Sequence, residues 1–206
     1  MSKTKTKILE SARELLNSQG ISAVSQRTIA DYLNISPGNL TYHFKKKSDI
    51  IEALYFELVE KMNELVLGIA TCEDILEGLY YFTKIMMEQF YEYRFLFLDF
   101  TQIMRENEVI NTHYSGLLTL RQQQFSSILQ ILVNDGLMRA EELPNEYEFL
   151  IKRMSIFGDF WLASAEINSN GISEKQIEEY LEMNSLIIYP YLTDKGKECF
   201  FEVIDR

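Results

Sequence analysis

A chain of 206 residues is long enough for one generous domain, or for a small domain joined to a larger one. With 47% hydrophobic and 25% charged residues, and no apolar run near the ~20 residues that span a bilayer, the composition is typical of a globular protein. The basic start is not followed by an apolar signal segment, and the chain has only two cysteines and two histidines. We therefore expect a cytoplasmic protein with free thiols, and no metal, cofactor or catalytic activity.

The net charge of −11 is divided unevenly along the chain. Residues 1–50 contain eight Lys or Arg and four acids, a balance of +4, so the remaining residues carry −15. A basic end on an acidic body indicates a contact surface for a polyanion. The alternative is a chance cluster of solvated charges.

The apolar residues recur at helical spacing and show no sustained two-residue alternation, which predicts an all-α fold. A first helix should end at Gly20, a second should begin at Ser25, and a third should cover residues 36–44. Asn34 can adopt the left-handed conformation in the turn between the second and third helices. Residues 7–44 thus predict a three-helix unit with a helix-turn-helix arrangement.

The rest of the chain is also predicted to be helical. A fourth helix should run from residue 47 or 48 to about 67, with a break near 68–71. Later helices are expected at 73–92, 94–106, 108–135, 145–168 and 174–191, and a short segment near 195–204. We predict two domains, residues 1–47 and 48–206.

The third helix is short and polar, and three lysines follow it. Apart from Leu40 and Phe44, its side chains offer a hydrogen-bonding group or little bulk. Such a helix is poor core material, but it suits phosphates and base edges.

These residues resemble a known family. The motifs are Gly20-Ile21, Thr28-Ile29-Ala30, the segment 36–44 and the pattern Phe44-x-x-Lys47-x-x-Ile50. They resemble the DNA-binding domain of TetR-type (TetR/AcrR) bacterial transcriptional regulators over about residues 3–63. The chain departs from the usual pattern at Thr41, where an aromatic residue is more common.

The resemblance implies a homodimeric transcriptional regulator. It would be a repressor that binds a pseudo-palindromic double-stranded DNA operator and is released by a small-molecule effector in the variable C-terminal half. The alternative is a helical architectural or partner-binding protein whose N-terminal unit docks to protein.

The resemblance also assigns roles to the matching residues. The start of the second helix would contact the DNA backbone, the third helix would enter the major groove, and the residues after it would hold phosphates. The predicted DNA-binding residues are Ser25, Gln26, Arg27, Thr28, Ser36, Pro37, Gly38, Asn39, Thr41, Tyr42, His43 and Lys47. As alternatives, the two serines can be helix caps only, and Arg27 can pair with Asp31.

In the C-terminal half, residues 95–104 are apolar around the whole helix, which predicts a central position. Arg121 lies on an apolar stripe and needs a partner, which Asp99 or, secondly, Asp159 would supply. This pair either is structural or orients an effector, and Arg121 can also reach water. The predicted ligand-binding residues are Phe90, Phe97, Asp99, Phe100, Tyr114, Arg121, Phe157 and Trp161.

The helices at 145–168 and 174–191 resemble the pair that forms the family's dimer interface. The predicted interface residues are Met154, Gly158, Leu162, Ala165, Ile177 and Leu181. Packing within one chain is the alternative.

Overall fold

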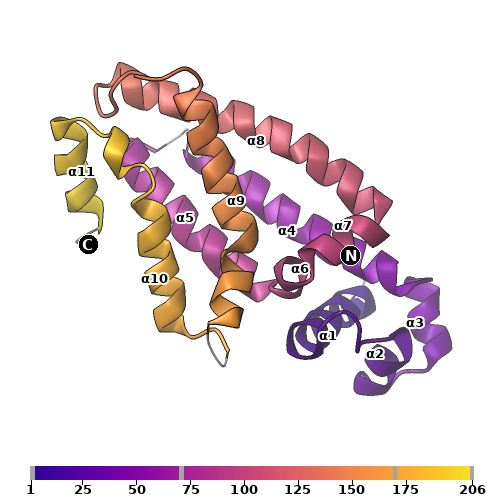
Figure 1. Cartoon of the computed structure of the whole chain (residues 1–206). Coiled ribbons are helices and arrows are strands. Elements are labelled where there is room, and N and C mark those ends of the chain that lie inside the picture. Colours follow the sequence, from indigo (N-terminus) through magenta and orange to yellow (C-terminus); the bar gives the residue numbers. More distant parts are fainter. Residues whose placement is uncertain (1–2, 70–71, 169–170, 205–206) are drawn as a thin grey trace. The chain divides into compact units, whose positions relative to one another are not determined.

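The computed structural model describes residues 3–69, 72–168 and 171–204. Within these ranges the chain is helical, as predicted, and the described residues contain no β-strand, only an isolated bridge between Met138 and Leu192. The helices are labelled in Figure 1. They are α1 (Lys3–Gln19), α2 (Gln26–Tyr32), α3 (Pro37–His43), α4 (Lys47–Ile69), α5 (Ile75–Glu92), α6 (Phe95–Leu98), α7 (Phe100–Glu106), α8 (Glu108–Asn134), α9 (Glu146–Ile167), α10 (Glu174–Ser185), the 3₁₀ turn η1 (Tyr189–Tyr191) and α11 (Asp194–Ile204).

Two predicted helices are divided in the structure. The helix expected at 94–106 is interrupted at Asp99, whose backbone leaves the helical region, and forms α6 and α7. The helix expected at 174–191 ends at Ser185, and η1 with Pro190 follows. The break expected at 68–71 and the joint at 168–171 lie partly outside the described residues.

Left-handed residues end or connect several helices, and the sequence predicted two of them, Gly20 and Asn34. Gly20 has φ +77° after α1, and Asn34 has φ 55° between α2 and α3. Gly136, with φ +72°, follows α8. At these positions a residue with a Cβ is disfavoured, except for Asn.

The chain divides into two compact units. The first, here called unit 1, comprises the residues up to Lys61 together with Glu92–His113, and unit 2 comprises Met62–Tyr91 and the residues from Tyr114 onward. These limits differ from the predicted boundary at residue 47, because the first part of α4 and the 92–113 segment belong with α1, α2 and α3.

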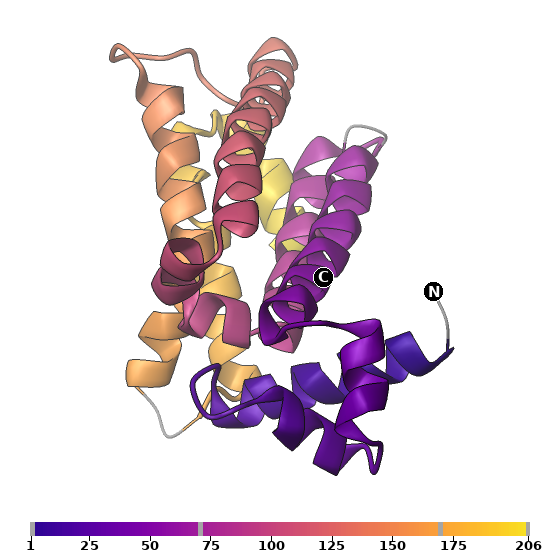
Figure 2. The same ribbon diagram turned by 90° about the vertical axis from the view of Figure 1, so that its right-hand side faces the viewer.

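Unit 1 has a core of aliphatic side chains from its first three helices. In Figure 2 these helices pack against one another, α1 beside α2 and α2 beside α3. The helical spacing that predicted them also sets their buried face, because positions three and four apart share one side of a helix. The buried residues are Ile8, Leu9, Ala12, Leu15 and Leu16 of α1, Ile29 and Ala30 of α2, and Leu40 of α3.

Unit 2 is closed by its last helix. The amide of Thr193 donates to the carbonyl of Leu137, and the amide of Arg139 donates to the carbonyl of Tyr191. A Cβ at Gly196 would lie 2.0 Å from the Leu137 oxygen, so only glycine allows α11 this approach.

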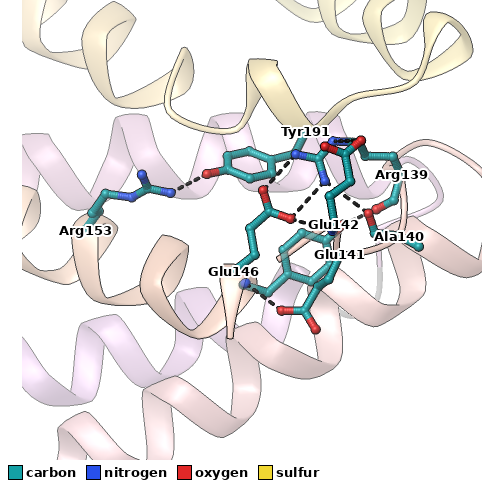
Figure 3. A network of polar contacts seen from close by, with 8 residues as sticks. Arg139, Ala140, Glu141, Glu142, Glu146, Arg153 and Tyr191 are labelled. Atoms are coloured by element: carbon teal, nitrogen blue, oxygen red, sulfur yellow. Dashed lines mark hydrogen bonds and ion pairs between the residues drawn. The ribbon is translucent and has the colours of Figure 1, made fainter. Parts of the chain in front are cut away.

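A polar network joins the start of α9 to this region (Figure 3). Arg139 donates through both terminal nitrogens to Glu146, at 2.9 and 2.8 Å, and Arg153 donates to the hydroxyl of Tyr191. The bond from Arg139 holds the pKa of Glu146 at about 2. The network thus fixes the connection between α8 and α9.

No helix in the described ranges combines the length and apolar character needed to cross a membrane. In the same ranges, no three His, Cys, Asp or Glu side chains gather in a way that could hold a metal ion.

Candidate nucleic-acid interface

The start of α2 is held by a capping box. Ser25 accepts a hydrogen bond from the amide of Thr28 at 3.1 Å, and the hydroxyl of Thr28 accepts one from the amide of Ser25 at 3.4 Å. These two bonds satisfy backbone donors that a helix start leaves open. Both residues remain close to solvent, so the capping role does not bury them.

The start of α3 is built from Ser36 and Pro37. Ser36 caps the helix by accepting from the amide of Asn39 at 3.2 Å, and Pro37 occupies the first turn. Ser36, Pro37, Gly38 and Asn39 are all exposed. A short, well-capped helix therefore presents its first turn to solvent, and the side chain of Asn39 is positioned by its capped backbone.

The second half of α3 presents Thr41, Tyr42 and His43. Tyr42 is 86% exposed, and its ring meets the half-buried His43 ring edge-on with 5.2 Å between centroids. The hydroxyl of Thr41 donates to the carbonyl of Pro37 at 2.9 Å. Since this bond uses the only proton of that hydroxyl, Thr41 has its methyl group, but no donor, to offer a DNA phosphate.

Two of the predicted phosphate contacts have partners inside unit 1. Lys47 donates to the carbonyls of Ile21 and Val24, at 2.7 and 3.0 Å, and Gln26 donates to the carbonyl of Phe44 at 2.7 Å. These bonds hold the α1–α2 turn and the end of α3. The ammonium of Lys47 therefore supports the backbone of a turn, and its contact with a phosphate stays a prediction.

Arg27 is the exposed cation of α2. Its Nε lies 3.8 Å from the carboxylate of Asp31, and both side chains are largely in solvent. Such exposed pairs are worth little, so the guanidinium can leave Asp31 for another anion. Leu40 and Phe44 are buried, as expected of packing residues.

Two side chains that support this unit were not predicted to do so. Asn17 donates to the carbonyl of Glu92 at 2.7 Å and accepts from the amide of Phe95 at 3.1 Å. Asp99, predicted to bind a ligand or Arg121, accepts from the amide of Ile21 at 3.1 Å. No sequence signal indicates either contact, because the partners are 75 to 78 residues apart.

The remaining predicted ligand residues are distributed over both units. Phe97 and Phe100 belong to unit 1, where their rings are nearly parallel, with centroids 6.5 Å apart. Phe90, Tyr114, Arg121, Phe157 and Trp161 belong to unit 2.

Arg121 has neutral partners in place of the expected acid. It donates to Asn63 Oδ1 at 2.6 Å and to Gln124 Oε1 at 2.7 Å, and burial lowers its pKa. Asp159 instead accepts a hydrogen bond from the hydroxyl of Tyr114 at 2.6 Å. Burial raises the pKa of Asp159 to about 6, although this hydrogen bond acts in the opposite direction.

Trp161 lies in an aromatic group between α9 and α10. Its ring is 5.5 Å from that of Tyr180, which is 6.1 Å from that of Phe157. The Trp161 side chain is 2% exposed, and its indole N–H has no hydrogen-bond acceptor among the described residues. A buried donor without a partner is costly, which distinguishes this position from ordinary core.

A small cavity lies elsewhere in unit 2, lined by residues of α5, α8, α9, α10 and α11 and by Ile188 between the last two. Its volume is about 30 Å³, room for roughly two water molecules. None of the predicted ligand residues lines it. The lining residues are Leu76, Leu79, Tyr80, Thr83, Phe125, Met154, Asn184, Ser185, Ile188 and Phe200.

Most of the predicted dimer residues point into unit 2. Gly158, Leu162, Ala165 and Leu181 are buried within the single chain, and Met154 and Ile177 are half-buried. The outward side of α9 carries other apolar residues, which are exposed: Phe149, Ile156, Phe160 and Ile167. The two helices remain candidates for the interface, but a different face of each is available to a partner.

These features define a helix-turn-helix unit of the DNA-binding type. The unit consists of the capped helices α2 and α3, the exposed polar face of α3 and the hydrogen bonds that support the turns. The chain carries it at the N-terminal end of a larger helical body.

Comparison with known proteins identifies the family. The model described as "Bacterial regulatory proteins, tetR family" matches residues 8–54, and the model described as "Bacterial transcriptional repressor" matches residues 58–200. The chain belongs to the TetR family, and it is a DNA-binding transcriptional regulator.

Individual relatives agree with this assignment. The probable HTH-type transcriptional regulator ArpR of Pseudomonas putida is 24% identical over 195 residues, which cover 87% of this chain and 90% of the relative. The HTH-type transcriptional regulator TtgR, also of P. putida, is 25% identical over 153 residues, 70% of each chain.

Solved structures show the same fold. A TetR-family regulator from Marinobacter aquaeolei has a TM-score of 0.82 at 24% identity, covering 99% of this chain and 98% of that one. A putative transcriptional regulator from Saccharomonospora viridis, solved in complex with choline, has a TM-score of 0.72 at 20% identity, covering 94% and 100%.

Proposed function

We propose that this regulator is a ligand-released repressor that binds a pseudo-palindromic operator as a homodimer. Unit 1 would read each half-site, and unit 2 would dimerise and sense the effector. The observation that carries the proposal is the exposed, capped α3, whose polar side chains have no role in the core.

Within unit 1, the accessible residues divide by chemistry. Asn39 can make a bidentate hydrogen bond with an adenine edge, and the methyl group of Thr41 suits a thymine methyl. Tyr42 and Arg27 carry exposed donors for phosphates. Lys47 would contribute mainly by holding the turn before α2, since its ammonium already bonds two carbonyls.

The test begins with selection of bound duplexes from a random DNA pool by the full-length protein. Asn39→Ala should then lose discrimination at one base position, by about 1–3 kcal/mol, while Tyr42→Ala should weaken binding to all sequences. Tyr81→Ala is the matched control, because Tyr81 is an exposed tyrosine of α5 in unit 2. Wild-type affinity in both α3 variants would refute the assigned contacts.

Dimerisation is proposed through the outward stripe of α9 together with Met183 of α10 and Leu186, which caps the end of that helix. Positions 149, 156, 160 and 167 recur at intervals of seven and four, so they share one side of the helix. Ile156 is 60% exposed and Ile167 83%. An exposed apolar stripe of this length is typical of an interface, and one seven-residue recognition helix makes too few contacts for operator affinity alone.

Sedimentation velocity tests this interface. Ile156→Lys should produce monomers and should abolish operator binding, because two half-sites one helical turn apart need two linked units. Leu118→Lys, at a 39% exposed apolar site of α8, is the control and should remain dimeric. If Ile156→Lys remains a dimer, the interface does not include this stripe of α9.

The effector is proposed to bind in unit 2 beside Trp161. The unpaired indole N–H favours a ligand that carries a hydrogen-bond acceptor, and Phe157 and Tyr180 offer aromatic contacts. The choline-bound neighbour supports the idea that this fold can hold a small molecule. Tyr114, Arg121 and Phe90 remain candidates for further contacts in the same unit.

The chain has a single tryptophan, so fluorescence excited at 295 nm reports Trp161 directly. Compounds, with choline among them, should be screened for a fluorescence change and for release of operator DNA. Trp161→Phe should reduce affinity for any compound that does both. A compound that releases the DNA equally well from Trp161→Phe would refute this location.

A further inference from the structure

The cavity of unit 2 has a buried polar side chain in its wall that is not satisfied by the fold. Asn184 of α10 is 6% exposed and lines the cavity. Its Oδ1 atom has no hydrogen-bond donor among the described residues. A buried acceptor without a donor costs free energy, because it has lost its water on folding. The wall therefore contains a group that a bound molecule can satisfy.

Two hydroxyls of the same wall have already donated their protons. The hydroxyl of Thr83 donates to the carbonyl of Leu79 at 2.8 Å. The hydroxyl of Ser185 donates to the carbonyl of Leu181 at 2.9 Å. Both oxygens keep lone pairs that can accept a hydrogen bond. Together with Asn184 Oδ1, they make the wall suitable for a molecule that donates one.

The chemistry of the wall also excludes a charged occupant. Among the described residues that line the cavity, none is acidic or basic. An ammonium or a carboxylate held here would be buried without a counter-ion, which is very costly. The rest of the wall is apolar or aromatic and consists of Leu76, Leu79, Tyr80, Phe125, Met154, Ile188 and Phe200. The wall thus favours a neutral, mainly apolar molecule.

The volume of the cavity limits the occupant to a few atoms. Its 30 Å³ is roughly one fifth of the ~150 Å³ that holds a benzene molecule, so about two to four non-hydrogen atoms fit. Two water molecules would also fit, but each normally makes about three hydrogen bonds, and a mainly apolar wall does not supply them. A short alcohol needs one acceptor, and its carbon atoms can face the apolar side chains.

Three side chains of the wall connect the cavity with the surface of unit 2. Tyr80, Phe125 and Met154 are half-buried, whereas Leu76, like most of the aliphatic wall, is buried. Methionine is unbranched and has several rotatable bonds, so its side chain can move aside at low cost. A small molecule can therefore enter here without the unfolding of a helix.

We propose that this cavity is a second small-molecule site of unit 2 and that it binds a short-chain aliphatic alcohol. The hydroxyl of the alcohol donates to Asn184 Oδ1, and its carbon atoms contact the apolar wall. The site is separate from the one proposed beside Trp161, which does not line the cavity and whose N–H favours an acceptor. Because the wall includes residues of α5, α8, α9, α10 and α11, the occupant contacts five helices at once.

The experiment compares two probes with the same number of non-hydrogen atoms, propan-2-ol and acetone. Only propan-2-ol has an O–H donor, so the difference between the probes reports the contact with the amide oxygen. Binding to the full-length protein, without DNA, is followed by saturation-transfer difference NMR. The side-chain amide signal of Asn184, assigned through its backbone resonances, reports the location.

Propan-2-ol should bind wild type with a half-saturation on the order of millimolar, because so few atoms bind weakly, and should shift the Asn184 signal. Acetone should bind about tenfold more weakly. Asn184→Leu should bind propan-2-ol about tenfold more weakly than wild type and should not distinguish the two probes. The matched control is Asn134→Leu, at an exposed position of α8, which should keep both wild-type affinities.

Two further variants test the location. Leu76→Phe adds side-chain volume at a buried position of the wall and should abolish binding of both probes, while the helical circular dichroism spectrum is retained. Trp161→Phe should bind propan-2-ol as wild type does, because Trp161 is not part of the wall.

Four results would overturn the proposal. If neither probe binds, the cavity holds no such molecule, and if both bind equally, the wall does not select a donor. Binding of propan-2-ol that survives Leu76→Phe would place the alcohol elsewhere, and loss of binding in Trp161→Phe would mean that the two sites are one.

The test remains decisive if a cavity variant fails to fold, because the comparison of the two probes on wild type is read at the Asn184 amide itself. The measurements contain no DNA. A failure of the proposed operator binding would therefore leave this result unaffected, and a failure here would leave the proposed function standing.

Discussion

Several polar side chains of unit 1 have a different kind of partner from those in the α8–α10 region of unit 2. In unit 1, Asn17, Gln26, Lys47 and Asp99 each bond a backbone group of a turn or helix end far along the chain. Between α8, α9 and α10 of unit 2, the buried polar groups bond other side chains, as Tyr114 does with Asp159, or have no partner among the described residues, as with the Trp161 N–H.

This difference has a physical meaning. A side chain that bonds the backbone fixes the path of the chain, because it can change partner only if the turn moves. A bond between two side chains can be exchanged by rotamer changes, and an unpaired buried donor is stabilised by any acceptor that reaches it. We interpret unit 1 as a rigid frame for α3, and the α8–α10 region as the part that can respond to a ligand.

The largest expected effect is at the end of unit 2 where α11 packs against the Leu137 backbone. Gly196→Ala would place a Cβ 2.0 Å from the Leu137 carbonyl, so the backbone must shift. We expect a loss of about 3 kcal/mol in the free energy of unfolding, measured by urea titration. Gly116→Ala in α8, where a Cβ meets nothing within 4 Å, should instead stabilise by about 0.5–1 kcal/mol. Equal stability of the two variants would contradict the docking of α11.

The hydrogen bonds that support the backbone of unit 1 are tested most directly by substitution of Lys47. Lys47→Met removes two charge-assisted hydrogen bonds to the α1–α2 turn, and we expect a cost of about 2 kcal/mol. Hydrogen exchange should show faster opening of the amides near Ile21 and Val24. Lys46→Met is the control, since its exposed side chain should change stability by less than about 0.5 kcal/mol. If Lys47→Met is as stable as wild type, Lys47 has no structural role, and phosphate binding is the only role left for it.

The responsive region should gain stability when Asp159 is neutralised. Burial raises the native pKa of this carboxyl to about 6 from an ordinary value of 3.8. Below pH 3.8 the group is protonated in both the folded and unfolded states, and stability is then lost as pH rises through 6. Asp159→Asn should therefore be about 1–2 kcal/mol more stable than wild type at about pH 7.5, with the difference gone near about pH 3.5. Asp135→Asn, at an exposed site, is the matched control.

The smallest effect on stability is expected at Arg27. Its pair with Asp31 is exposed and 3.8 Å long, so Arg27→Ala should change the free energy of unfolding by less than about 0.5 kcal/mol. Operator affinity should fall while the unfolding midpoint stays the same. A large loss of stability would mean that Arg27 belongs to the frame and is not available to DNA.

Features set by neighbouring residues were predictable from the sequence. The caps at Ser25 and Ser36, the left-handed Gly20 and Asn34, and most helix limits depend on contacts within a few residues. The burial of Leu40 followed from its apolar side chain in an otherwise polar helix. The family resemblance added the function, which the comparisons support.

Features set by distant residues were not predictable. Asp99 interrupts a helix and bonds Ile21, which is 78 residues away, and Arg121 finds Asn63, which is 58 residues away. The outward face of α9 could not be predicted for another reason. Helix α9 is apolar around most of its circumference, so periodicity identifies the helix but cannot tell the side of Leu162 from the side of Ile156.

The docking of α11 has a consequence for how this surface can vary. Main-chain hydrogen bonds hold the segment before this helix. They join Thr193 to Leu137 and Arg139 to Tyr191. Such bonds do not depend on which side chains the outer face of α11 carries. The outer face of the helix can therefore acquire a new surface by substitution without losing its attachment, provided that residue 196 remains glycine and that Phe200 and Val203 stay in the core.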